Sequence, residues 1–205
     1  MVDLTMSFKK NWALNWGSLR LCIQYFFQER VQDELDNVFG RSSRPTLDTP
    51  KESLPYTHAV LEECYRKTSL AHTGVPHSAL ADLKVGDRII PTGTIIIQNL
   101  YGIHHDPRYW DEPEKFMPER FLDADGNFKG RGESLHPFGI GRRYCLGQSL
   151  AEKEFFLFFT GILHRFKLER VEGECLPGKE QNLSVPNWYI HCLCCSWLCT
   201  TSNCF

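Results

Sequence analysis

The sequence predicts a mainly α-helical protein with a small β-sheet, that is, an α+β fold. Three stretches place apolar residues at the spacing of an amphipathic helix, two in the first half of the chain and one directly after Cys145. Between them, two short β-branched runs flank the turn residues Pro91-Thr92-Gly93, a pattern typical of a hairpin. Of the 205 residues 42% are apolar, so a compact core can form.

Composition and charge exclude several kinds of protein. The net charge of −2 provides no basic surface for nucleic acid. No apolar run reaches the roughly 18 residues of a membrane-spanning helix, and the first residues lack a signal-peptide pattern, so we expect no membrane anchor or leader in this chain. Five of the nine cysteines lie between Cys192 and Cys204. A disulfide framework would be spread through the domain, so we expect reduced thiols and an intracellular protein.

The first helix is expected over residues 25–39. Val31, Leu35 and Val38 share one face of it, with acidic and amide side chains outside, so this face is expected to be buried. Gly40 is a natural stop, because glycine readily takes the left-handed conformation that ends many helices.

A second helix is expected to begin near Ser53 and to run to about Ser69. Pro55 fits its first turn, where a backbone N–H has no helical partner. Glu63 and Arg66 are three residues apart, so they lie on one face and can form an ion pair.

The middle of the chain is expected to be extended and then irregular. The hairpin is assigned to strands Arg88–Ile90 and Thr94–Ile97. Residues 99–128 are rich in Pro, Asp and aromatic side chains, so an ordered but irregular segment is expected. His104 and His105 suggest a metal site at first sight, but adjacent side chains point apart and no third ligand has suitable spacing. We interpret both as structural.

A long helix is expected after Cys145. Apolar residues recur at helical spacing from Leu146 to Phe166, and about 20 residues give a helix of roughly 30 Å. Its apolar face is wide, so it should pack inside a larger structure. Residues 168–187 alternate polar residues with turn formers, consistent with strands and loops.

The stretch from His136 to Gly147 reads HPFGIGRRYCLG and carries the strongest chemical signal. It places Cys145 between a glycine-rich loop and a helix N-terminus, with Arg142 and Arg143 just upstream. Free N–H groups, the helix dipole and nearby guanidinium groups all favour a thiolate at such a position. The loop therefore predicts a cysteine that binds a ligand rather than one that fills a core.

This loop resembles the haem-binding loop of the cytochrome P450 monooxygenases, written F-x-x-G-x-R-x-C-x-G. All five fixed positions occur at the right spacing; they are Phe138, Gly141, Arg143, Cys145 and Gly147. The resemblance implies haem b (iron protoporphyrin IX) as cofactor, with the thiolate of Cys145 as the axial metal ligand of the iron. It also implies that Arg143 neutralises a haem propionate and that Phe138 packs near the sulfur. Gly139 and Gly141 would be further cofactor-binding positions, where the backbone turns tightly.

Three further matches follow the order of this family. Glu63-Cys64-Tyr65-Arg66 resembles its E-x-x-R pair, and Pro118-Glu119-Arg120-Phe121 resembles the motif that supplies a second arginine. The resemblance implies a buried structural triad of Glu63, Arg66 and Arg120 on the haem side of the scaffold, rather than solvated pairs. Gly74-Val75-Pro76-His77 resembles a segment of the microsomal family 2 clade, in which the position of His77 bonds a propionate.

The resemblance covers residues 28–187 and implies the C-terminal, haem-binding part of the cytochrome P450 fold, an incomplete one. Residues 1–27 are unassigned and unlike the family, and residues 188–205 form a divergent cysteine-rich tail that we expect to be poorly ordered. The membrane anchor, most of the substrate pocket and the family's oxygen-activating helix are expected to be missing. We therefore assign no catalytic residue.

The resemblance implies a monooxygenase that inserts one oxygen atom from O2 into a small apolar organic substrate. Electrons would come through NADPH-cytochrome P450 reductase, and the full-length family lies in the endoplasmic reticulum membrane. One alternative is a non-catalytic truncated fragment that binds haem weakly or not at all. A remote one is zinc binding by the tail cluster, which is His191, Cys192, Cys194, Cys195 and Cys199.

Overall fold

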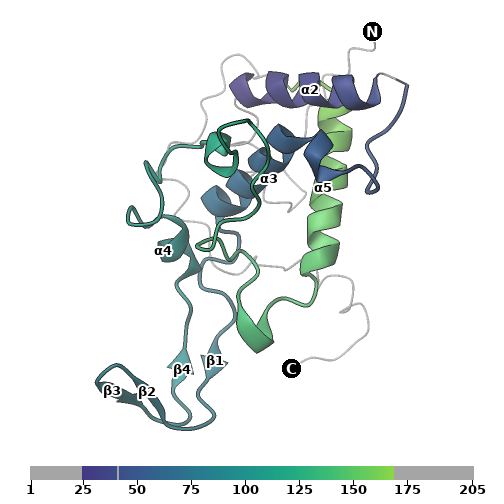
Figure 1. Cartoon of the computed structure of the whole chain (residues 1–205). Coiled ribbons are helices and arrows are strands. Elements are labelled where there is room, and N and C mark those ends of the chain that lie inside the picture. The colour runs from purple at the N-terminus through teal and green to yellow at the C-terminus, as the bar shows by residue number, and fades with distance from the viewer. Residues whose placement is uncertain (1–24, 41, 169–205) are drawn as a thin grey trace, which may run out of the picture.

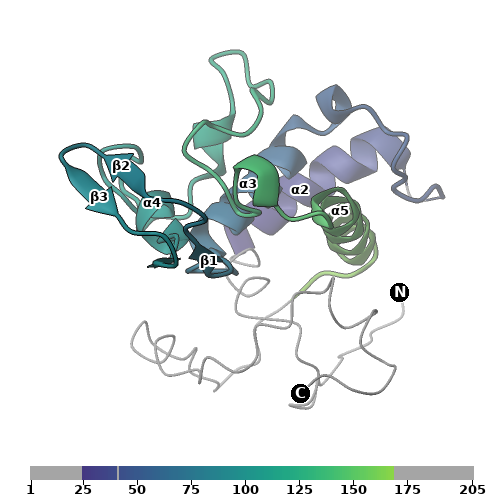
Figure 2. The same cartoon turned by 90° about the horizontal axis from the view of Figure 1, so that it is seen from below.

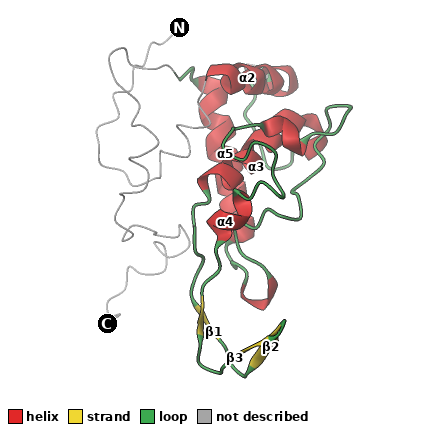
Figure 3. Ribbon diagram, turned by 90° about the vertical axis from the view of Figure 1, so that its left-hand side faces the viewer, coloured by secondary structure: helices red, strands yellow, loops and turns green. Residues whose placement is uncertain are grey.

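The computed structural model describes residues 25–40 and 42–168, and within them the fold is mainly helical with two small antiparallel sheets. This confirms the predicted α+β class. Helices α2, α3 and α5 make up the body of the molecule, and the strands extend from one end of it (Figures 1 and 3). The helices are α2 (Tyr25–Phe39), α3 (Pro55–Thr68), α4 (Leu100–His104) and α5 (Gln148–Arg165). Short 3₁₀ turns are η1 (Lys51–Ser53), η2 (Pro118–Phe121) and η3 (Gly141–Arg143).

The helix boundaries agree closely with the sequence pattern. Helix α3 begins at Pro55, directly after η1, so proline occupies the first turn as predicted. Helix α5 begins at Gln148, three residues after Cys145, and its 18 residues span about 27 Å. The expected irregular segment of residues 99–128 contains only α4 and η2 as helical elements.

A hydrophobic core forms where α2, α3 and α5 meet. Val31 and Leu35 of α2 are fully buried there, whereas Val38 in the last turn of α2 keeps 40% of its surface exposed. The apolar face predicted for this helix is therefore buried at Val31 and Leu35 but not at Val38. The buried members of this core are Val31, Leu35, Leu54, Tyr56, Val60, Leu61, Cys64, Phe156, Phe159 and Leu163.

Polar side chains of α2 fix its place against the other two helices. The Glu34 carboxylate accepts hydrogen bonds from the backbone N–H groups of Tyr56 (2.9 Å) and Thr57 (2.7 Å). These are N-terminal amides of α3, which has no side-chain cap of its own, so α2 supplies the cap. Gln32 Nε2 donates to the carbonyl oxygen of Leu163 at 2.8 Å and so ties α2 to the end of α5.

The predicted hairpin is wrong in its pairing. Strand β3 (Arg88–Ile90) pairs with β2 (Leu83–Val85), and β4 (Ile95–Ile96) pairs with β1 (His77–Ser78). The two-residue connection Gly86-Asp87 joins β2 to β3, and Gly86 takes a φ of +58°, which suits glycine. Two residues containing glycine close a hairpin more readily than the longer Pro91-Thr92-Gly93 connection.

The turn at Pro91 forms, but it serves a different purpose. Thr94 N donates to Pro91 O at 3.2 Å, which closes the turn. Gly93 N then donates to Ala79 O (2.8 Å) and Ala79 N donates to Thr94 O (2.9 Å). These bonds lead the chain toward β1, so β4 cannot fold back on β3.

His58 of α3 makes the core sensitive to acid. Its ring stacks on Phe156 (centroids 5.3 Å apart, 7° between planes) and lies 5.5 Å from the ring of Phe128. Burial, assisted by the nearby Lys51 charge, lowers the pKa of His58 from 6.5 to about 4. Between pH 6.5 and 4 the unfolded state therefore binds more protons at His58 than the folded state does. The contribution of the neutral His58 to the free energy of unfolding is fully present above pH 6.5 and is lost as the pH falls toward 4.

We predict that His58→Phe keeps the stacking and weakens this acid sensitivity. In the wild type, His58 lowers the free energy of unfolding by at most about 1.4 kcal/mol for each pH unit of acidification. His104, whose pKa burial also lowers to about 4, stays in the variant, so the slope is reduced rather than abolished. Urea unfolding at several pH values measures the slope; a slope equal to that of the wild type would contradict the prediction.

Candidate functional site

The Cys145 loop, residues 136–147, leads into the N-terminus of α5, which is the lower end of this helix in Figure 1. Cys145 is a free, half-buried cysteine. Its backbone N–H donates to the carbonyl oxygen of Phe138 at 2.9 Å, which closes the loop, and its own carbonyl accepts from Gln148 N at 3.2 Å. The thiol is thereby held beside the N-terminus of α5, where the helix dipole favours negative charge.

Two glycines permit the path of this loop. Gly139 has a φ of +74° and Gly141 a φ of +78°, both in the left-handed region that other residues rarely take. A Cβ on Gly141 would meet nothing within 4 Å, and on Gly139 only Gln98 Oε1 at 3.8 Å. Backbone conformation rather than lack of space therefore requires glycine at these positions.

Of the two predicted propionate-binding residues, Arg143 lies within this loop and His77 lies in strand β1. Arg143 is an exposed residue of η3 and forms no ion pair with another described residue. His77 is half-buried in β1 and is not bonded to the Cys145 loop within the described residues. The Gln98 side chain lies near both Gly74 and the loop, since its Oε1 would be 3.4 Å from a Cβ at Gly74 and 3.8 Å from a Cβ at Gly139. Seen from below, the loop lies between the strands and α5 (Figure 2).

Glu63, Arg66 and Arg120 lie together. Arg66 donates from Nε to Glu63 Oε2 (2.7 Å) and from Nη2 to Glu63 Oε1 (2.8 Å), and both side chains are fully buried. Arg120 Nε lies 3.3 Å from the same carboxylate. The carboxylate also accepts from the backbone N–H of Met117 at 2.8 Å. One buried carboxylate therefore holds two guanidinium groups and the segment that leads into η2.

Every N–H of the Arg66 guanidinium has a partner. Besides the two bonds to Glu63, it donates to the carbonyl oxygens of His104 (2.9 Å), Pro113 (2.9 Å) and Lys115 (3.0 Å). An arginine has five N–H donors, so its hydrogen-bonding capacity is complete. Arg66 therefore attaches the irregular segment that follows α4 to helix α3.

His104 links α3 to the Cys145 loop, a role that no sequence spacing indicated. Its Nδ1 lies 2.8 Å from Ser69 Oγ, and its Nε2 accepts from the backbone N–H of His136 at 3.0 Å. Ser69 Oγ donates to Arg66 O at 2.9 Å, so it accepts the proton of Nδ1. Burial first, then the neighbouring His105 and His136, lower the pKa of His104 to about 4, which keeps it neutral at pH 7.

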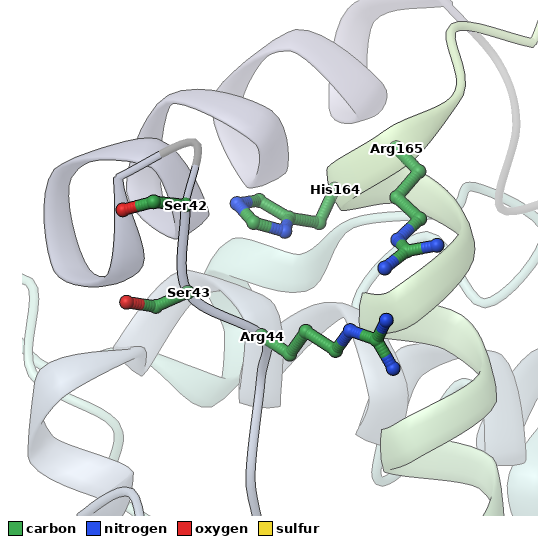
Figure 4. Close-up of a pocket in the computed structure, with 5 residues that line it drawn as sticks. All are labelled: Ser42, Ser43, Arg44, His164 and Arg165. Carbon is green, nitrogen blue, oxygen red and sulfur yellow. The ribbon is translucent and has the colours of Figure 1, made fainter.

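A separate polar depression lies at the opposite end of α5 from Cys145. It is lined by Ser42, Ser43, Arg44, His164 and Arg165 (Figure 4). His164 is occupied there by a 2.7 Å hydrogen bond between Nε2 and the carbonyl oxygen of Gly40. None of the predicted site residues contributes to it.

The Cys145 loop fits the iron of a haem, because the porphyrin already supplies most of the ligands of that iron. Among the described residues, no group of three or more His, Cys, Asp or Glu side chains could hold a bare metal ion. A half-buried thiol supplies a single bond, which is what a haem iron takes from its proximal side. Ile140 and Leu146 of the same loop expose 58% and 91% of their surfaces, and such exposed apolar side chains suit contact with a porphyrin face.

Comparison with known proteins identifies the family. The cytochrome P450 family model matches residues 11–192, and the chain belongs to the cytochrome P450 family, close to its microsomal family 2. This match begins before residue 28 and ends after residue 187, and parts of it lie outside the described residues. The family consists of haem proteins, which agrees with the donor chemistry of the loop.

Several curated relatives align with most of this chain. Farnesoate epoxidase of Bombyx mori is 45% identical over 153 residues, covering 75% of this chain and 30% of that protein. Cytochrome P450 2D4 of Rattus norvegicus is 40% identical over 88% of this chain and 36% of its own length. Cytochrome P450 2D26 of the same species is 38% identical over 85% and 34%. The chain thus spans about a third of the length of these relatives.

No helix in the described part of the chain has the length and apolar character needed to cross a membrane.

We predict that Glu63→Gln is strongly destabilising. It leaves the fully buried Arg66 guanidinium without a counter-charge, a change that costs about 3–5 kcal/mol. The matched control is Lys115→Gln, which breaks an exposed pair with Glu112 and should cost less than about 1 kcal/mol. Urea unfolding measures both; equal losses in the two variants would show that the buried pair has no special role.

Proposed function

We propose that this chain is the cysteine-bearing, C-terminal part of a haem-thiolate monooxygenase, and that it binds haem b through Cys145 Sγ. One observation carries the proposal. In a chain of the cytochrome P450 family, a free half-buried thiol stands at the start of α5 in a loop closed by the Cys145–Phe138 hydrogen bond. When bound, haem supplies the O2 chemistry, and electron donation from a thiolate ligand favours O–O cleavage.

The chain's own residues would hold and orient the cofactor. Arg143 would place its charge beside one propionate, and His77 would hydrogen bond to a propionate from the strand side. The Phe138 ring would pack near the sulfur, and Gly141, with Gly139 beside it, would let the backbone turn tightly beneath the porphyrin. The N-terminus of α5 would stabilise the negative charge on Cys145 Sγ.

The triad would have a structural role and would not contact the haem or the substrate. Glu63, Arg66 and Arg120 bond to one another and to backbone carbonyls, so they would keep the scaffold behind the haem rigid. We assign no catalytic residue to this chain.

Substrate, partner and location follow from the family. The substrate would be a small apolar organic molecule, and one relative is named for epoxidation of farnesoate. Electrons would come from NADPH-cytochrome P450 reductase, and the full-length protein would lie in the endoplasmic reticulum membrane. The division into residues 1–27, 28–187 and 188–205 stays a prediction, and the proposed zinc cluster of the tail lies outside the described residues.

We predict that the purified chain takes up added haem with Cys145 as ligand. After reduction and addition of carbon monoxide, the Soret band should be shifted to the red, because the ligand opposite carbon monoxide is a thiolate. The shift should be lost in Cys145→Ala. The control is Ser149→Ala, which alters an exposed residue of α5 and keeps the thiol.

Two outcomes would count against this proposal. Haem uptake without the shift would reject Cys145 as the ligand. No uptake at all would favour the alternative, a non-catalytic fragment that does not bind haem.

We predict that Arg143→Gln weakens haem binding by roughly tenfold, because a propionate loses its charged partner. The neighbouring Arg142→Gln is the matched control, since Arg142 is exposed in the same turn η3 and lies outside the fixed positions of the loop. Haem titration followed by absorbance gives both dissociation constants. Equal effects of the two substitutions would mean that only the net charge of the loop matters.

A further inference from the structure

A second charged group joins α3, α5 and the segment that precedes the Cys145 loop. Arg131 donates from Nε to Glu62 Oε2 at 2.7 Å and from Nη2 to Glu62 Oε1 at 3.0 Å. The same Nη2 lies 3.0 Å from Glu152 Oε1 of α5. The side chains of Arg131 and Glu62 are only 22% and 15% exposed, so this pair is well shielded from solvent. We call Arg131, Glu62 and Glu152 the clamp.

The clamp lies directly against the aromatic residue that closes the Cys145 loop. The guanidinium carbon of Arg131 is 5.8 Å from the centroid of the Phe138 ring and 5.3 Å from that of Tyr65. Tyr65 in turn meets Phe138 edge to face at 5.4 Å and Phe155 of α5 at 5.3 Å. The Phe138 ring is therefore fixed by a cation and a neighbouring ring, each of which also contacts a helix.

The backbone of Phe138 transmits this position to the thiol. Its carbonyl oxygen is the acceptor for the Cys145 N–H at 2.9 Å. Residues 140–144 between them are exposed, and within the described residues no side chain holds them. The loop thus depends on its N-terminal part, which is held at His136 by His104 and at Phe138 by the clamp.

The charges make Arg131 hard to replace. Burial raises the pKa of Glu62, and the hydrogen bond and charge of Arg131 oppose that rise. Without Arg131, the carboxylates of Glu62 and Glu152, which both bond to its Nη2, would lie near each other with no cation between them. Lysine would supply the charge, but neither the two-pronged geometry nor the flat group that lies on the rings.

We propose that Arg131 is a positioning residue for the Cys145 loop: the clamp holds Phe138, and Phe138 fixes the place of the Cys145 thiol. This inference rests on the proposed function for its consequence at the haem iron. Its structural part, the fixing of the loop, holds with or without haem.

Amide hydrogen exchange of the haem-free chain tests the structural part. In Arg131→Gln, exchange at the Cys145 amide should accelerate by at least roughly tenfold, and in Arg131→Lys by less. Lys153→Gln, an exposed neighbour of Glu152 on α5, should leave it unchanged. The Met117 amide, bonded to Glu63, is the internal reference. No acceleration at Cys145, or equal acceleration at Met117, would overturn the proposal.

The carbon monoxide complex tests the consequence at the haem. Among haem-bound molecules, the ratio of the red-shifted Soret band to the unshifted one should fall by roughly tenfold in Arg131→Gln and stay constant in Lys153→Gln. This ratio counts haem-bound molecules alone, so chains that unfold and bind no haem do not change it. A constant ratio in Arg131→Gln would overturn the claim about the thiol.

The two measurements separate this inference from the proposed function. If the wild-type chain binds no haem, the proposed function fails, and the exchange rate at Cys145 alone decides whether the clamp fixes the loop. If the wild-type chain binds haem through Cys145 while Arg131→Gln matches it in both measurements, the proposed function stands and the clamp is rejected.

Discussion

Glu63 and Arg66 place a full ion pair inside the molecule, where neither charge can be solvated by water. Desolvation of two charges is costly, and the cost is offset here because all five donors of Arg66 are bonded, three of them to carbonyl oxygens of residues 104–115. An irregular segment without regular hydrogen bonding of its own thereby obtains one conformation. We therefore expect the pair to contribute a specific arrangement more than it contributes net stability.

Helix α3 carries this order toward the Cys145 loop along one face. Glu62, Tyr65 and Arg66 stand at positions i, i+3 and i+4, which lie on one face of a helix, and Ser69 is the residue that ends α3. Ser69 bonds to His104, which in turn bonds to the backbone of His136. Glu62 bonds to Arg131, which lies against the Phe138 ring, and Tyr65 contacts that ring directly. The N-terminal part of the loop that holds the thiol is thus connected at two positions to α3 and its C-terminal cap.

The sequence allowed the helices and the loop to be predicted because their signals are local. Pro55, Gly139 and the amphipathic face of α2 act within a few residues of their position. The hairpin failed because strand pairing depends on competing turns, and Gly86-Asp87 outweighed Pro91-Thr92-Gly93. Spacing likewise gave no indication that His104 and Arg131 support the loop, since their partners are 32 and 69 residues away in sequence.

X-ray absorption at the iron edge of the haem-loaded chain tests the central claim, that this fold presents Cys145 as a metal ligand, most directly. The account predicts one sulfur atom in the first coordination shell of the iron, and its replacement by oxygen or nitrogen in Cys145→Ser. A first shell of nitrogen and oxygen alone in the wild-type chain would contradict it.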